Sequence, residues 1–178
     1  MAQAAQSKSA SQSNKTLQDL LEHGLKDMYY AEKKIYKSLP KMIKAASNDK
    51  LRDALEAHRE ETGGHIDKLE QAFEALGKRA RAERCDAMDG ILEEGDSLLG
   101  DFGGSPAGDA AIIFSAQAVE HYEITRYGSL ATYAELLGLG DVKKLLGEIL
   151  EQEEAADEKL STIAEGGVNS EAAEGARA

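Results

Sequence analysis

Residues 16–42 read TLQDLLEHGLKDMYYAEKKIYKSLPKM, a pattern typical of one long amphipathic helix. Apolar side chains recur at alternating intervals of three and four residues, which places them on one face of an α-helix. Position 32 falls on this apolar face and is a glutamate. Thr16, followed three residues later by Asp19, is expected to cap the helix start, and Pro40 to kink or locally break the helix. The apolar face consists of Leu17, Leu21, Leu25, Met28, Ile35, Leu39 and Met42.

Three further segments show the same period and complete a set of four long helices. They run from Ser47 or Asn48 to Gly77, from about Asp109 to Gly138, and from Asp141, a predicted cap, to just before Gly166. The joints after the first and third helices are short, so each of these pairs forms an antiparallel hairpin. Residues 78–106 link the hairpins and contain a short amphipathic piece at 85–99. The sequence therefore predicts an all-α, ferritin-like four-helix bundle with a long crossover, with an up-down-up-down bundle as the alternative.

The amino-acid composition limits where in the cell the protein is expected and which partners it is expected to bind. Residues 1–15 and 166–178 are small and polar, so we expect a disordered arm and a disordered tail around one domain at 16–165. The net charge of −12 argues against nucleic acid and anionic lipid as partners. No apolar run approaches the ~20 residues that cross a bilayer, and no hydrophobic signal core begins the chain. With a single cysteine, Cys85, the sequence predicts a soluble, cytoplasmic protein without disulfides.

Each of the four predicted buried faces is interrupted near its middle by an acid or a histidine. Burying four or more ionised groups costs several kcal/mol each unless something compensates them. One acid on one face is most simply a solvated edge, but four at matching depth point to metal binding. Two cations would compensate the charges, and carboxylate and imidazole ligands suit iron or manganese. The predicted metal ligands are Glu32, His58, Glu61, Glu120, Glu123, Glu153 and Asp157.

Four more side chains flank this predicted centre, and each has two interpretations. His65 is either a partner that orients a ligand or a core histidine. His121 is either a ligand or a hydrogen-bonded orienter of one. Tyr30 and Tyr122 are close enough in sequence to predicted ligands to hydrogen-bond the site or to be oxidised by it. The alternative for both is an amphipathic tyrosine at a helix edge.

The same segments resemble the YciF/YciE-like ferritin-like proteins of bacterial stress regulons. The matching stretches, all within residues 16–165, are TLQDLLEHGLKDMYYAEKKIYKSLPKM, LEAHREETGGHIDKLEQAFEALG, CDAMDGILEEG, SAQAVEHYEITRYGSL and LEQEEAADEKL. QAVEHYEITRYG is the most specific of them. The resemblance implies a ferritin-like bundle, usually dimeric, with a dinuclear metal centre and a link to stress response, but no particular reaction. His65 stands where many relatives have Gln, and Gln152 where Glu is common, so coordination by the second and fourth helices is least determined.

Two functions follow, and whether the protein is an enzyme stays open between them. In the first, a dinuclear metalloprotein reacts with dioxygen or peroxide, because hard carboxylate ligands leave positions where a small oxidant can bridge the metals. Ferritin-like analogy makes Glu32 and Glu153 terminal ligands, Glu61 and Glu120 bridging ligands and His58 the nitrogen donor. In the second, a non-catalytic metal-binding or structural homodimer acts in stress protection. Iron storage is a third, weaker alternative, since nothing in the sequence dictates a shell of many subunits.

Overall fold

The computed structural model describes residues 14–175, and within them every regular element is a helix. The all-α class is thereby confirmed. No helix of the described part is long and apolar enough to cross a membrane. The elements are α1 (Leu17–Ala45), α2 (Asp49–Ala75), α3 (Asp86–Phe102), α4 (Gly108–Leu136), α5 (Gly140–Ile163), the π-helical turn η1 (Ala164–Val168) and α6 (Asn169–Gly175).

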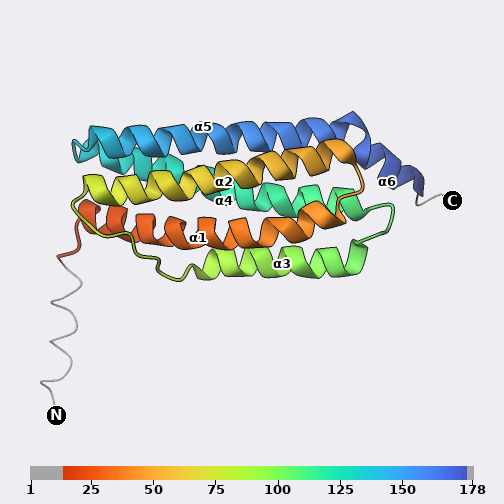
Figure 1. Ribbon diagram of the computed structural model, residues 1–178, viewed down its shortest axis with the longest axis horizontal. Helices are drawn as coiled ribbons and strands as arrows, with labels where there is room; N and C mark the ends of the chain where they lie inside the picture. Colours follow the sequence, from red (N-terminus) through yellow and green to blue (C-terminus); the bar gives the residue numbers. More distant parts are fainter. Residues whose placement is uncertain (1–13, 176–178) are drawn as a thin grey trace, which may run out of the picture.

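Helices α1, α2, α4 and α5 form a four-helix bundle (Figure 1). In this bundle α2 contacts α1 and α5, and α4 contacts the same two helices from the other side. Helices α1 and α2 form one antiparallel pair and α4 and α5 the other, because each pair is joined by a short turn. Helix α3 lies outside, along α1 and α4, and returns the chain to the end of the molecule where α2 began (Figure 1). As a result, α2 and α4 run in the same direction.

Of the two predicted capping residues, Thr16 caps its helix and Asp141 does not. Thr16 and Asp19 form a complete capping box at the start of α1, and the Asn48 side chain caps α2. Asp141 does not cap α5, which begins one residue earlier and has no side-chain cap. The turn after α4 is so tight that Asp141 already lies in the first turn of α5. Helix α1 continues through Pro40 without a break.

The predicted disordered tail is wrong for residues 166–175, which are helical as the end of η1 and α6. Gly167 adopts φ +153°, a conformation that favours glycine, and this bends the chain between α5 and α6. Val168 then returns to the core and is 3% exposed. The Gly166–Gly167 pair therefore marks a bend rather than the end of the ordered chain. Residues 1–13 and 176–178 lie outside the described residues, so the rest of both terminal predictions stays untested.

The apolar faces of the helices meet along the bundle axis and form one core. Most residues of the predicted faces are buried there, among them Leu21, Leu25, Leu51 and Leu146. Polar side chains are buried in the same core at mid-length of the helices. These are Glu32, His58, Thr62, His65, Ser115, Glu120, Glu123 and Glu153.

Candidate metal centre

Every helix of the bundle contributes an acid or a histidine to one buried cluster. Glu32 comes from α1, and Glu153 comes from α5. Helix α2 contributes two histidines and α4 contributes two glutamates. The paired residues are seven apart on α2 and three apart on α4, spacings that return side chains to one helix face. The six side chains are at most 6% exposed; they are Glu32, His58, His65, Glu120, Glu123 and Glu153.

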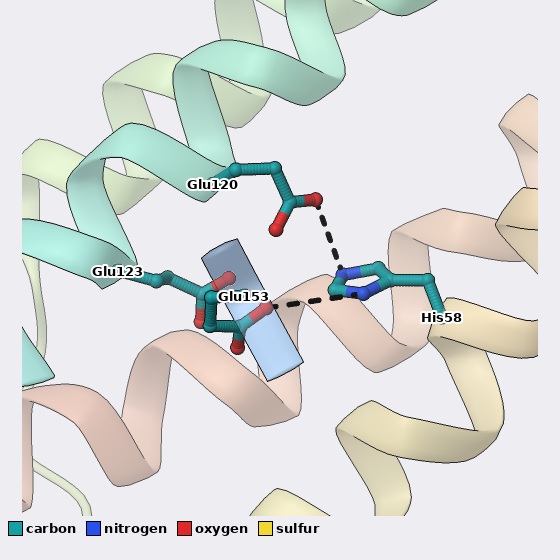
Figure 2. Close-up of side chains that lie close together, drawn as sticks. All are labelled: His58, Glu120, Glu123 and Glu153. Atoms are coloured by element: carbon teal, nitrogen blue, oxygen red, sulfur yellow. Dashed lines mark ion pairs between the residues drawn. The ribbon is translucent and has the colours of Figure 1, made fainter. Parts of the chain in front are cut away.

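Four of these side chains form the first donor group, His58, Glu120, Glu123 and Glu153 (Figure 2). One nitrogen or oxygen atom from each lies within 4.8 Å of the other three. His58 Nε2 is 3.4 Å from Glu120 Oε1, and His58 Nδ1 is 3.9 Å from Glu153 Oε2. Three carboxylates and one imidazole thus converge on a volume suited to a single cation.

The second donor group consists of Glu32, His65 and Glu153. His65 Nδ1 lies 3.0 Å from Glu153 Oε1 and 3.4 Å from Glu32 Oε1. Glu153 belongs to both groups, with Oε1 toward His65 and Oε2 toward His58. The Glu153 carboxylate is therefore the one that the two groups share, and the terminal role expected for it stays a prediction.

Most donor atoms of the cluster lack a hydrogen bond among the described residues, although His58, His65 and Glu153 make the ion-pair contacts given above. The atoms without a hydrogen bond are both ring nitrogens of His58 and His65, both oxygens of Glu123 and Glu153, and Oε2 of Glu120. A buried polar atom left without a partner costs about 1–3 kcal/mol. Imidazole nitrogens and carboxylate oxygens are ligands of iron and manganese, so the unpartnered atoms fit metal ions at both groups.

Burial and neighbouring charges divide the cluster into neutral and charged members. Burial raises the pKa of Glu120 and Glu123 well above the usual range, and the nearby Glu153 raises both further. Burial lowers the pKa of His58, which favours the neutral ring that can bind a metal. Burial also opposes the charge on His65, but Glu153 and Glu32 outweigh it and raise the pKa of His65 to about 10. Burial likewise favours the neutral form of Glu153, but the contact with His65 prevails and lowers its pKa.

The comparisons with known proteins agree with this arrangement of helices. A family described as "Domain of unknown function (DUF892)" matches residues 16–173. Protein YciF of Escherichia coli (strain K12) is 43% identical over 159 residues, which cover 89% of this chain and 96% of YciF. This chain belongs to the YciF family. The resemblance stated from the sequence motifs is thereby confirmed.

Solved structures of relatives extend the match to three dimensions. The crystal structure of the E. coli stress protein YciF matches with a TM-score of 0.83 and 44% identity, over 87% of this chain and 98% of that one. YcfI of Rhodopseudomonas palustris, whose description suggests a structural role, matches with a TM-score of 0.81 and 47% identity, over 83% and 94%. A protein of Xanthomonas campestris at 23% identity, with a TM-score of 0.68 over 88% of this chain and 96% of that one, shares the fold.

Three predicted residues lie at the edge of the cluster or outside it in this YciF-family chain. The Glu61 side chain is 40% exposed, with Oε2 4.0 Å from His58 Nδ1, so it lies at the rim of the first group. Asp157 belongs to neither group: it accepts a hydrogen bond from Gln117 and pairs with His121 at 3.2 Å. His121 is mostly exposed and does not reach the cluster.

The two tyrosines flagged by sequence are bonded elsewhere. The Tyr30 hydroxyl donates to Asp89 at 2.9 Å. The Tyr122 hydroxyl donates to Asp27 at 2.6 Å and lies 3.0 Å from the Cys85 sulfur. Neither hydroxyl makes a hydrogen bond with a member of the two donor groups, so the helix-edge interpretation describes both better.

Tyr127 is the residue of this site that the sequence interpretation missed. Its hydroxyl donates a short hydrogen bond to Glu32 in the core. The sequence spacing could have indicated this role, because Tyr127 follows Glu120 by seven residues and Glu123 by four. These intervals place all three side chains on one helix face. His65 proves to be more than a core histidine, since it contacts both carboxylates of the second group.

Proposed function

We propose that this YciF-family protein is a dinuclear metalloprotein of the stress response that reacts with a small oxidant, peroxide or dioxygen. Two adjacent groups of buried, unpartnered donor atoms that share one carboxylate carry this proposal. The ferritin-like bundle is part of it, supported by the parallel course of α2 and α4 and by the crossover through α3. When bound, iron or manganese ions supply Lewis acidity and electron transfer.

The chain's own residues would hold one ion at each group. His58, Glu120 and Glu123 face the first position, Glu32 and His65 face the second, and the two oxygens of Glu153 divide between them. Ligands bind metal only when deprotonated, so Glu120, Glu123 and His65 release protons on loading. The Tyr127 hydroxyl fixes the orientation of Glu32, as partners outside the ligand set commonly do.

A non-catalytic structural role is the second candidate, and one observation favours it. The relative YcfI carries a description that suggests a structural role. In this candidate the ions tie the four helices together at their middle, and no oxidant is consumed. For both candidates we infer a cytoplasmic homodimer as the working form, since the family resemblance implies a dimer and the single cysteine suits a reducing compartment.

Metal stoichiometry tests the proposal directly. Protein purified without chelator and then loaded with Fe(II) or Mn(II) should bind close to two ions per chain. Glu153→Gln should lose both ions because Glu153 belongs to both groups, whereas Glu154→Gln, on an exposed neighbour in α5, should keep them. Consumption of peroxide by the loaded protein separates the two candidates: turnover supports the first, and two bound ions without turnover support the second. A chain that binds no ions contradicts both.

A further inference from the structure

A cleft of about 380 Å³ lies between α2 and α5 and leads to the candidate metal centre. Three residues at its inner wall are His58, Glu61 and Glu120. Glu32 and His65, the members of the second group alone, do not line it. The cleft therefore meets the centre only on the side of the first group.

The inner wall presents buried polar atoms that lack partners. His58 is 6% exposed and Glu120 is 2% exposed. Both ring nitrogens of His58 and Oε2 of Glu120 have no hydrogen-bond partner among the described residues. The cleft thus ends on two side chains that also belong to the first donor group.

Part of the cleft wall is apolar. Alanines from both helices leave the space open where larger side chains would fill it. A volume of this size falls within the range of small-molecule pockets, roughly 300–1,000 Å³, and is far larger than the ~30 Å³ that a water molecule takes up in the liquid. An oxidant with two oxygen atoms, such as dioxygen or hydrogen peroxide, would leave most of it empty, so the cleft suits an organic molecule. The apolar lining consists of Ala54, Leu55, Ala57, Ala155, Ala156 and Leu160.

One end of the cleft carries two lysines. Lys50 of α2 and Lys159 of α5 line it, and both also line the adjoining surface hollow. Six other lysines form ion pairs, but neither of these two does within residues 14–175. Asp53 lines the cleft within one helical turn of Lys50, and Asp49 and Glu171 line the adjoining hollow. Along α2 the lining extends from Lys50 to Glu61, roughly 16 Å at 1.5 Å per residue.

We propose that the α2–α5 cleft binds an elongated organic anion. Its negative group pairs with Lys50 and Lys159, its apolar chain lies along the alanines, and its far end reaches His58 and Glu120. Binding itself needs only the cleft, whereas the role of this anion as a substrate rests on the proposed function. The proposal adds a substrate class to a centre that would otherwise take only a small oxidant.

Isothermal titration of the full chain with decanoate tests the proposal, with and without loaded metal. We expect saturable binding of one decanoate per chain and at least tenfold weaker binding to the Lys50→Glu/Lys159→Glu variant. Lys37→Glu/Lys44→Glu, which reverses two exposed lysines of α1, should bind like the wild type. Ala156→Leu should weaken binding by filling the cleft, and decylamine, a cation of equal chain length, should bind at least tenfold more weakly than decanoate.

Several results would overturn the cleft as an anion site. They are the absence of saturable decanoate binding, equal affinity for decylamine, or an undiminished affinity in the Lys50→Glu/Lys159→Glu variant. Metal stoichiometry on the same samples keeps the two proposals apart. Decanoate binding by a chain that takes no metal supports the cleft and contradicts the proposed function. Two bound ions in a chain that never binds decanoate contradict the cleft alone.

Discussion

Replacing Glu123 by glutamine tests whether this carboxyl is neutral when metal is absent. The side chain is fully buried, and neither of its oxygens has a hydrogen-bond partner among the described residues. Burial raises its pKa well above the usual range, and Glu153 and Glu32 raise it further. Glutamine keeps the shape of the protonated acid but cannot ionise. We therefore expect Glu123→Gln to stabilise the metal-free protein at neutral pH while weakening its metal binding.

Proton linkage gives the size of this effect. A glutamate in the unfolded chain has a pKa of ~4.3, so above that pH the unfolded chain releases a proton that native Glu123 keeps. The free energy of unfolding then falls by about 1.4 kcal/mol per pH unit, until the pH passes the native pKa. Glutamine cannot ionise, so the Glu123→Gln variant does not lose this part of its free energy of unfolding as the pH rises. The stability of Glu123→Gln relative to wild type is thus constant below about pH 4 and grows by about 1.4 kcal/mol per unit above about pH 5.

Urea unfolding followed by far-UV circular dichroism measures this difference in chelator-containing buffer at several pH values between about 5 and 7.5. Glu154→Gln, on the exposed face of α5, is the control and should show no such growth. A difference between Glu123→Gln and wild type that stays the same at every pH would refute the reasoning. It would mean that Glu123 is ionised in the native protein and therefore hydrated or paired.

Three further outcomes test other contacts. Tyr127→Phe removes the hydrogen bond to buried Glu32 and should lower the free energy of unfolding by about 1–3 kcal/mol, with Tyr133→Phe as a control that changes little. Asp109→Ala removes the acceptor of two backbone N–H groups just before α2 and should cost about 1–2 kcal/mol in urea unfolding, unlike Asp101→Ala. Chelation should lower the melting temperature of loaded protein, since an ion at a hundred times its Kd contributes about 2.7 kcal/mol; identical melting curves would contradict metal binding.

Much of the fold could be predicted because local signals and burial agree along the chain. The capping box at Thr16 marks the start of α1, and the period of three and four residues marks its buried face. The tail could not be predicted in the same way. Val168 is a lone apolar residue among small and polar ones. Its burial in the core and the contacts of α6 with α4 hold residues 169–175, and neither can be seen in the local sequence.

The members of the centre could be predicted because charged groups interrupt apolar faces, as Glu32 and Glu153 do. Their roles could not, because they depend on how far α5 lies from α1 and α4. Asp157 shows the limit: one turn beyond Glu153, its carboxylate already lies with Gln117 and outside the cluster. Tyr127 was missed for a different reason. A tyrosine ring fits an apolar pattern, and its hydroxyl becomes informative only when a buried acceptor is known to face it.

The two candidate metal positions make unequal demands on the protein. At the first, the His58 ring favours its neutral form, and the cleft gives access from solvent. At the second, His65 must lose a proton, and its pKa is raised to about 10. Neither Glu32 nor His65 lines the cleft. Removing that proton at neutral pH costs free energy, because Glu153 and Glu32 stabilise the charged ring. An ion at the second position would have to offset this cost. It would do so by binding Glu32 and Glu153, which otherwise attract the protonated His65 ring. If ions bind as proposed, the second position would be the weaker of the two at low pH, and the first is the one that a ligand in the cleft would reach.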